Sequence, residues 1–114
     1  MNDCLFCRIV RKEIPASVIY EDEDVLVIND VNPQAPLHAL VIPRRHIATL
    51  NELSPHDDAL AGQMIRRAAS IAREKGYADR GFRTVFNTNA EAGQTVFHIH
   101  LHVLAGRGLT WPPG

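Results

Sequence analysis

Three histidines recur at every second position of the apolar run TVFHIHLHVLAG, which spans Thr95 to Gly106. Successive side chains of a β-strand point to opposite faces of its sheet, so this run predicts a long strand that begins at Thr95. One face of that strand carries His98, His100 and His102. The other face is expected to point into a hydrophobic core and consists of Phe97, Ile99, Leu101 and Val103. The run therefore predicts a half-buried strand that packs on one side and offers imidazoles on the other.

The other apolar runs predict an α+β domain built on an antiparallel sheet. In chain order we expect a short helix within 4–15, a hairpin around an acidic turn within 17–33, a strand at 38–43, a long helix, a strand at 81–89, a loop at 90–94 and the histidine strand. Ser54 is the natural N-cap of the long helix, Pro55 is its first residue and Gly76 follows its end. The apolar stripe of this helix consists of Leu60, Met64, Ile65, Ala68 and Ile71. The length of 114 residues fits one domain, residues 1–114.

The charges of the chain are balanced, with 12 Lys and Arg against 13 Asp and Glu. They are interspersed along the sequence, so nothing indicates the basic footprint of a protein that binds nucleic acid or an anionic membrane. No apolar run approaches the roughly 18 residues that a membrane span requires, and the first residues do not show the cationic start and apolar stretch typical of a secretory leader. We therefore expect a cytoplasmic protein whose partner is a small molecule or another copy of itself.

The histidine run points to chemistry because imidazole titrates near neutral pH. A histidine can act in the cell as a nucleophile, a proton donor or a hydrogen-bond donor to an anionic oxygen. Three neighbouring imidazoles suit phosphoryl transfer, in which one attacks phosphorus and the others hold the oxygens. Two other interpretations stay open on the residues alone, namely a solvent-facing surface and a metal site formed by the strand itself.

The segment from His98 to Leu104 resembles the His-φ-His-φ-His-φ-φ signature of the histidine triad (HIT) superfamily, where φ is an apolar residue. The resemblance extends along essentially the whole chain, through CLFCRIVRKEIPASVIYED, DVNPQAPLHALVIPRRHI, FNTN, GQTVFHIHLHVLAGR and the terminal WPPG. The last block is similar to the Hint branch, whose members are nucleoside phosphoramidate hydrolases. The resemblance implies a five-stranded antiparallel sheet with one long and one short helix, and a homodimer in which two such sheets join into one of ten strands.

For catalysis, the resemblance implies hydrolysis of the P–N bond in purine nucleoside phosphoramidates, and of acyl-adenylates, with release of AMP or GMP. His100 stands in the place of the family's nucleophile and would form a covalent nucleotidyl-histidine with no metal in the chemical step. His102 and His38 match histidines of the phosphate site. Thr95 stands where the family uses Ser beside the leaving group.

For the nucleotide, the family's binding positions match Phe6, Ile9, Ile28, Asp30, Val31, Asn87, Gln94 and again His102. Asp30 is implied to hold the ribose hydroxyls. On the residues alone, the apolar members of this set are equally well explained as core and Asp30 as a turn residue.

The two cysteines, Cys4 and Cys7, are too close in sequence to close a long loop with a disulfide. Several bacterial triad proteins hold a structural zinc with Cys-x-x-Cys, a histidine after the VIP strand and the first histidine of the triad. The matching set here is Cys4, Cys7, His46 and His98, so the resemblance implies structural Zn²⁺. Two alternatives stay open: buried cysteines that pack as small apolar residues, and a thioredoxin-like redox pair without its usual βαβ surroundings.

Other classes of function also stay open. They are a dinucleoside polyphosphate hydrolase of another branch, a nucleotide-binding regulator or scaffold with weak hydrolysis, and a zinc-dependent module. The intact triad favours the enzyme, because binding alone does not require the nucleophile His100.

Overall fold

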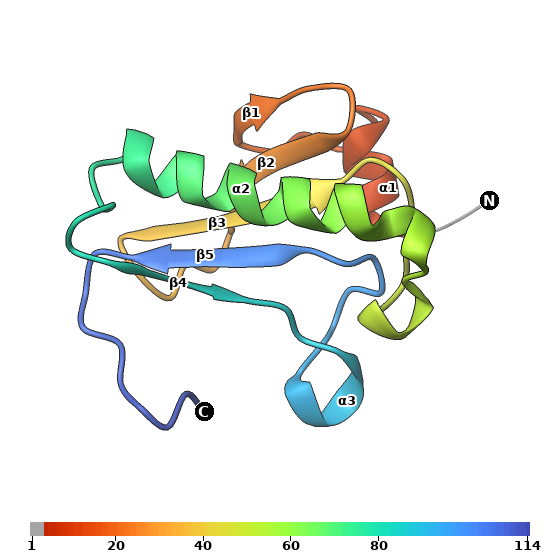
Figure 1. The fold of residues 1–114 in the computed structure, drawn as a ribbon. Helices are drawn as coiled ribbons and strands as arrows, with labels where there is room; N and C mark the ends of the chain where they lie inside the picture. The colour runs from red at the N-terminus through yellow and green to blue at the C-terminus, as the bar shows by residue number, and fades with distance from the viewer. Residues whose placement is uncertain (1–3) are drawn as a thin grey trace.

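The computed structural model describes residues 4–114. Its centre is a five-stranded antiparallel sheet in the order β1-β2-β3-β5-β4 (Figure 1). The strands are β1 (Val18–Glu21), β2 (Val25–Asn29), β3 (Leu37–Pro43), β4 (Phe82–Val85) and β5 (Leu101–Ala105). The α-helices are α1 (Leu5–Val10), α2 (Asp58–Glu74) and α3 (Asn89–Ala92), and the 3₁₀ turns are η1 (Leu50–Glu52) and η2 (Pro55–Asp57). The predicted α+β fold with a five-stranded antiparallel sheet is confirmed.

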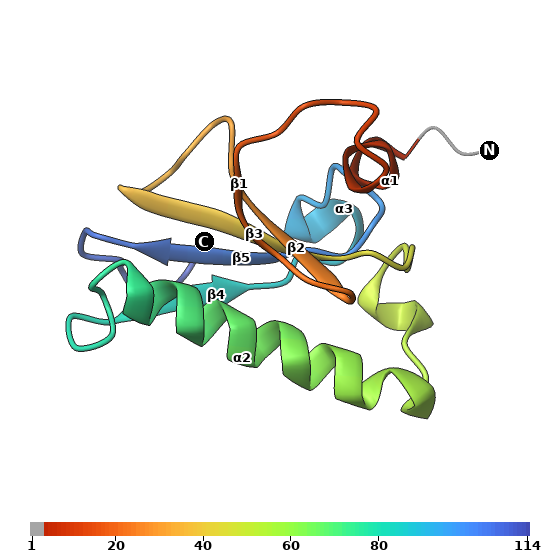
Figure 2. The same cartoon turned by 90° about the horizontal axis from the view of Figure 1, so that it is seen from above.

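β2 and the central strand β3 have buried apolar side chains on both faces, so each face of the sheet has its own core. Val25 and Val27 of β2 belong to the cluster that packs with Met64 of α2, while Leu26 and Ile28 belong to the cluster that contains Phe6 of α1. Figure 2 shows α1 and α2 on opposite sides of the sheet. The long helix therefore leaves the α1 face open for a site.

Short polar segments set the turns between these elements. The carboxylate Oδ1 of Asp22 accepts hydrogen bonds from the backbone N–H groups of Asp24 and Val25, which closes the acidic turn between β1 and β2. Ser54 and Asp57 form a capping box at the start of the predicted long helix. The first turn of that helix is the 3₁₀ turn η2, and α2 continues from it. The hairpin and the cap were both predicted from the sequence.

The histidine strand is shorter than predicted. β5 begins at Leu101, because the pairing with β3 ends at Val41 opposite Leu101. Before that point the backbone N–H of Ile99 donates to the carbonyl of Ile47, a loop residue, at 2.7 Å. Phe97, expected in the core, is 47% exposed, whereas His98 is fully buried. The strict alternation holds only within β5, and His98 and His100 lie before that strand.

Three smaller expectations also need correction. The predicted loop at 90–94 overlaps the helix α3, whose C-cap is Gly93 with φ 86°. Ile65, expected on the buried stripe of α2, is 55% exposed. The predicted strand at 81–89 is paired only over β4. Within residues 4–114, no helix has the length and apolar character needed to cross a membrane.

Candidate active site and metal centre

The segment that precedes β5 turns the first triad histidine into the protein interior, against α1. The ring nitrogen Nε2 of His98 lies 2.7 Å from the carbonyl oxygen of Pro43, to which it donates a hydrogen bond. A neutral imidazole that carries its proton on Nε2 has a lone pair on Nδ1. Burial lowers the pKa of His98 to about 4, so at neutral pH this lone pair is present and available.

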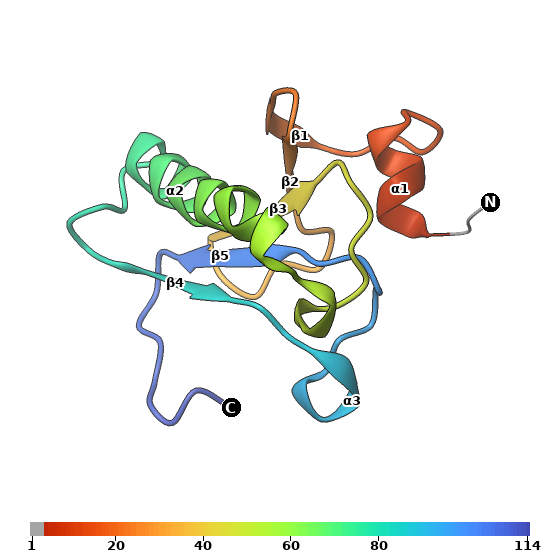
Figure 3. The ribbon, with the colours of Figure 1, turned by 45° about the vertical axis from the view of Figure 1, so that its right-hand side comes forward.

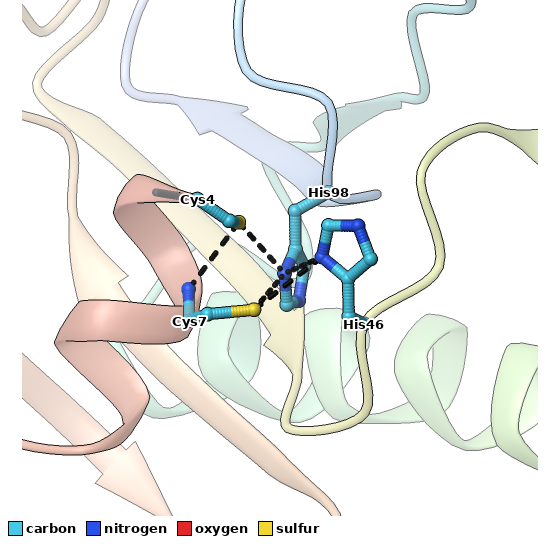
Figure 4. Close-up of side chains that lie close together, drawn as sticks. All are labelled: Cys4, Cys7, His46 and His98. Atoms are coloured by element: carbon cyan, nitrogen blue, oxygen red, sulfur yellow. Dashed lines mark hydrogen bonds between the residues drawn. The ribbon is translucent and has the colours of Figure 1, made fainter. Parts of the chain in front are cut away.

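The lone pair of His98 points toward ligand atoms of three other residues. We call the four residues Cys4, Cys7, His46 and His98 the Cys/His centre (Figure 4). The Nδ1 of His98 lies 3.3 Å from the Sγ of Cys4, 3.5 Å from the Sγ of Cys7 and 3.2 Å from the Nδ1 of His46. The Sγ of Cys7 is 3.3 Å from the Nδ1 of His46. The four ligand atoms come from α1, the loop after β3 and the segment before β5.

This geometry fits a tetrahedral zinc ion. With Zn–N near 2.0 Å and Zn–S near 2.3 Å, tetrahedral ligands lie about 3.3 Å apart for two nitrogens and about 3.6 Å for sulfur and nitrogen. The observed separations of 3.2 Å and of 3.3 to 3.5 Å match these values. The hydrogen bond from His98 to the Pro43 carbonyl is the outer contact that fixes such a ligand in structural zinc sites.

The middle histidine of the triad is oriented by the first. The Nδ1 of His100 donates to the backbone carbonyl of His98 at 2.8 Å. The proton of the neutral ring is therefore on Nδ1, and the lone pair is on Nε2. Burial also lowers the pKa of His100, which favours the neutral form. The arrangement leaves His100 with one unprotonated nitrogen, as a nucleophile requires.

The third histidine belongs to a second group, the Asp/His cluster (Asp30, His38 and His102). The backbone N–H of Gln34 donates to the Nδ1 of His38 at 2.9 Å, so the proton of that ring is on Nε2. The Nε2 atom of His38 lies 2.9 Å from the Nδ1 of His102 and 3.3 Å from a carboxylate oxygen of Asp30. His102 therefore accepts at Nδ1 and carries its own proton on Nε2.

Both rings of this cluster are kept neutral by burial. Burial, together with the smaller effect of the neighbouring rings of His100 and His38, lowers the pKa of His102 to about 4. Burial lowers the pKa of His38 as well, against the opposing effect of the Asp30 carboxylate. At neutral pH the cluster is a directed chain of hydrogen bonds from Gln34 through His38 to His102.

A pocket of about 300 Å³ opens on the α1 face beside these groups. The predicted residues that line it are Phe6, Ile9, Ile28, Asp30, Val31, Asn87, Gln94, Thr95, His100 and His102. Five lining residues were missed from the sequence, namely Leu5, Asn29, Leu40, Gly93 and Val96. Their signals were weak, because Leu5 and Leu40 are typical of ordinary core, Val96 lies in the predicted histidine strand, and Asn29 and Gly93 are typical of a turn or loop. The pocket brings the predicted catalytic and nucleotide-binding residues together.

The remaining predicted site residue, His38, lines an adjoining pocket of about 270 Å³. The two pockets share His102 and Asn87. Arg83 and Arg107 also line the second pocket and were not identified from the sequence. A ligand bound across His102 would therefore extend from the apolar pocket toward two guanidinium groups.

The wall formed by residues 89–96 is held by one buried amide. The Nε2 of Gln94 donates to the carbonyls of Ala48 and Val96, and its Oε1 accepts from the backbone N–H of Asn89. Figure 3 shows α3, within this segment, at the same end of the sheet as α1. Gln94 thus positions the loop that presents Thr95, whose side chain is exposed at the pocket edge.

Comparisons with known proteins agree with this geometry. A family model described as "HIT domain" matches residues 11–109. The chain is 44% identical over 108 residues to the purine nucleoside phosphoramidase of Escherichia coli K12, covering 95% of this chain and 91% of that protein. It is 49% identical over 113 residues to an uncharacterized HIT-like protein of Synechocystis, covering 99% of this chain and 98% of that protein.

Solved structures show the same similarity. A HIT family hydrolase from Legionella pneumophila Philadelphia 1 superposes with a TM-score of 0.97 at 49% identity, over 98% of this chain and 100% of that chain. A zinc-bound histidine triad family protein from Mycobacterium smegmatis superposes with a TM-score of 0.79 at 43% identity, over 92% of this chain and 76% of that chain.

Proposed function

The chain belongs to the HIT domain family, as its sequence resemblance indicated, and from this premise we propose that it hydrolyses the P–N bond of purine nucleoside phosphoramidates to release AMP or GMP. Acyl-adenylates form a second substrate class in this proposal. The family relationship supports a nucleotide hydrolase in general. The observation that carries the finer proposal is the hydrogen bond from His100 Nδ1 to the His98 carbonyl, since it leaves Nε2 unprotonated at the pocket.

In the first step, the Nε2 lone pair of His100 attacks the α-phosphorus in line with the leaving nitrogen. A bond forms between Nε2 and phosphorus, and the P–N bond breaks with its electron pair on nitrogen. The leaving nitrogen departs as an amine after it takes a proton from solvent through the Thr95 hydroxyl. The Nε2–H of His102 donates to a phosphoryl oxygen, because the hydrogen bond from His38 holds its other nitrogen as an acceptor.

In the second step, water attacks the same phosphorus, the Nε2–phosphorus bond breaks and its electron pair returns to His100. The attacking water releases one proton to solvent, which replaces the proton that the amine took in the first step. One water is consumed over both steps, and the products are the amine and the nucleoside monophosphate. Splitting one displacement into two gives each step a good nucleophile or a good leaving group. Neither step needs a metal ion.

The apolar part of the pocket suits a purine. Phe6, Ile9 and Ile28 are buried side chains that belong to the core and also line the pocket, so the two interpretations left open by the sequence are compatible. Asp30 is the carboxylate of the lining set and suits the ribose hydroxyls, while Asn87 lies between the two pockets on the phosphate side. Val31, fully exposed at the rim, completes the proposed nucleotide site.

Zinc belongs to the proposal as a structural ion held by Cys4, Cys7, His46 and His98. When bound, it would link α1 to the loop after β3 and to the segment before β5. The nucleophile His100 is outside this ligand set, so the chemical step is left to the side chains.

The proposal also includes a homodimer and a cytoplasmic location. Within the described residues 4–114, β4 is an edge strand and pairs with β5 alone. An unpaired edge is where a second copy adds its own strand, which is how a sheet of ten strands would arise. Both statements stay predictions.

The test is release of AMP from adenosine 5′-phosphoramidate by the wild type and by His100→Gly, each with and without a chelator. We expect turnover by the wild type, a loss of at least about 10⁴-fold in the variant, and a chemical step in the wild type that does not require free metal. A wild type that binds AMP but releases none would favour the nucleotide-binding regulator, and cleavage of diadenosine polyphosphates alone would favour the other hydrolase branch.

A further inference from the structure

The helix α1 takes part in both the metal centre and the nucleotide pocket. Cys4, at its N-cap, and Cys7 supply sulfur to the Cys/His centre. Leu5, Phe6 and Ile9 of the same helix line the pocket. The helix has only six residues, and isolated helices of that length are not stable in water. Its position therefore depends on what its side chains contact.

Phe6 stands between the two cysteines in sequence and between the two sites in space. Its ring is 5% exposed. It meets the His100 ring at a centroid distance of 4.9 Å and an interplanar angle of 86°, and the His98 ring at 6.0 Å and 77°. Both are edge-to-face contacts of the kind that stabilise aromatic pairs. Phe6 thus touches a proposed metal ligand and the proposed nucleophile.

Three contacts orient the His100 ring. One is its hydrogen bond to the carbonyl of His98, another is the perpendicular ring of Phe6, and the third is the tilted ring of His102 at a centroid distance of 5.0 Å. The torsion that turns an imidazole ring is broad, so a single hydrogen bond leaves the ring free to tilt, and the packed rings restrict that tilt. The first two contacts come from His98, a member of the Cys/His centre, and from Phe6, which lies between Cys4 and Cys7 in sequence.

We propose that Phe6 is a positioning residue for His100 and that the Cys/His centre, through α1 and through His98, holds two of the three groups that orient this ring. The inference rests on the proposed function for its catalytic consequence. It means that metal occupancy sets the geometry of the nucleophile although no metal takes part in the chemical step. Phe6 then does more than form a wall for the base.

The test compares zinc-loaded wild type with Phe6→Leu, which keeps an apolar side chain but removes the ring. Arg8→Gln is the matched control, because Arg8 lies on the same helix, is exposed and does not line the pocket. Four quantities are measured: zinc content, AMP affinity by calorimetry, kcat and KM for adenosine 5′-phosphoramidate, and the ¹⁵N shifts of the His100 ring.

For Phe6→Leu we expect full zinc content and a fall in kcat of roughly 10- to 100-fold, the scale of a small misplacement of a reacting group. We expect AMP affinity to change by less than about 3-fold, and the His100 ¹⁵N shifts to show a mixture of tautomers instead of a single Nδ1–H form. Arg8→Gln should match the wild type in all four. Weaker AMP binding with an unchanged kcat would overturn the proposal, since Phe6 would then serve the base alone.

A second arm removes zinc from the wild type with a chelator and repeats the ¹⁵N measurement, so the test does not depend on the folding of Phe6→Leu. We expect the same mixture of His100 tautomers and faster hydrogen exchange of the α1 amides. Since zinc and Phe6 act on one ring, removing both should lower kcat by less than the product of the separate losses. An unchanged His100 spectrum without zinc would overturn the proposal. A wild type with no hydrolysis would refute only the proposed function, because the spectra are read without turnover.

Discussion

The Cys/His centre and the Asp/His cluster are built from similar residues, but they differ in one ring nitrogen that points inward. In the first group this nitrogen carries a lone pair, and in the second it carries a proton. Both groups bring their ligand atoms within 4.8 Å of one another. In the Cys/His centre, His98 donates outward from Nε2 to the Pro43 carbonyl, so a lone pair points inward. In the Asp/His cluster, the backbone N–H of Gln34 occupies the outer nitrogen of His38, so an N–H points inward.

The group that points into each cluster, a lone pair or an N–H, determines which kind of partner that cluster can bind. Converging imidazole lone pairs and cysteine sulfurs suit a cation at their centre, because each ligand atom offers it an electron pair. A ring that directs an N–H toward the Nδ1 of His102 and a carboxylate of Asp30 already has its positive partner in that proton. Proximity of ligand atoms is therefore not sufficient for a metal site. The backbone group at the far side of each ring makes the distinction.

The largest expected effect that tests this comparison is on zinc affinity. We expect Cys7→Ser to lower zinc affinity by more than about 100-fold, because loss of a direct ligand should exceed the 10- to 100-fold effect of an outer contact. We expect His102→Asn to keep one zinc per chain with unchanged affinity. Zinc content by mass spectrometry and Co²⁺ absorption, which reports thiolate ligands, measure both.

The opposite result would reverse the assignment of the two clusters. Zinc retained by Cys7→Ser and lost by His102→Asn would place the metal on the Asp/His cluster. A second tight equivalent in the wild type, removed by His102→Asn, would show that the inward proton of His38 does not exclude a cation.

The next effect concerns catalysis and uses two variants of one residue. His38→Leu removes the hydrogen bond that fixes the tautomer of His102, and we expect kcat to fall by roughly 10- to 100-fold. His38→Gln places an amide nitrogen where Nε2 of the imidazole lies, so it can still donate to His102. We expect it to recover most of the rate. Zinc content should be unchanged in both, since His38 is outside the Cys/His centre.

Equal losses in the two variants would contradict a role for the Nε2–H of His38. In that case the buried ring, 6% exposed, would matter for packing instead of for its proton. Thermal unfolding of both variants separates these outcomes, because a packing defect lowers the unfolding temperature together with the rate.

Much of this architecture could be predicted from the sequence, because its signals are local or carried by blocks of residues. The N-cap Ser54, the acidic turn at Asp22 and the apolar runs of β2 and β3 each depend on a few neighbouring residues. The triad and Cys-x-x-Cys blocks likewise indicated the residues that gather in the pocket and in the Cys/His centre. Periodicity alone, however, extended the histidine strand too far.

The errors and omissions come from partners that lie elsewhere in the chain. Residues before Leu101 have strand-like alternation but no strand beside them, since Ile99 bonds to the loop residue Ile47. The groups that fix the histidine tautomers are backbone atoms of Pro43, Gln34 and His98. Backbone N–H and carbonyl groups are nearly the same in every residue, so the sequence contains no signal for them.

The smallest effect is the pH dependence of stability, which distinguishes the neutral Asp/His cluster from an ionic one. The pKa of His102 is lowered from 6.5 to about 4 by burial, so between these values the unfolded chain binds more protons than the folded one. Stability from this residue is therefore complete above its unfolded pKa and is lost as pH falls toward about 4.

His102→Asn removes this titration. The free energy of unfolding of the variant should therefore fall less than that of the wild type between about pH 7 and pH 5. The difference between the two pH slopes corresponds to at most about one bound proton. Urea unfolding of both proteins at the two pH values, each loaded with zinc, measures the difference. Comparing the two proteins cancels the contribution of His98, whose pKa is also lowered to about 4 and whose protonation competes with the metal. Equal slopes would mean that His102 titrates alike in the folded and unfolded chains, which is inconsistent with a buried neutral acceptor for His38. A steeper fall in the wild type supports the directed chain of hydrogen bonds that separates this cluster from the Cys/His centre.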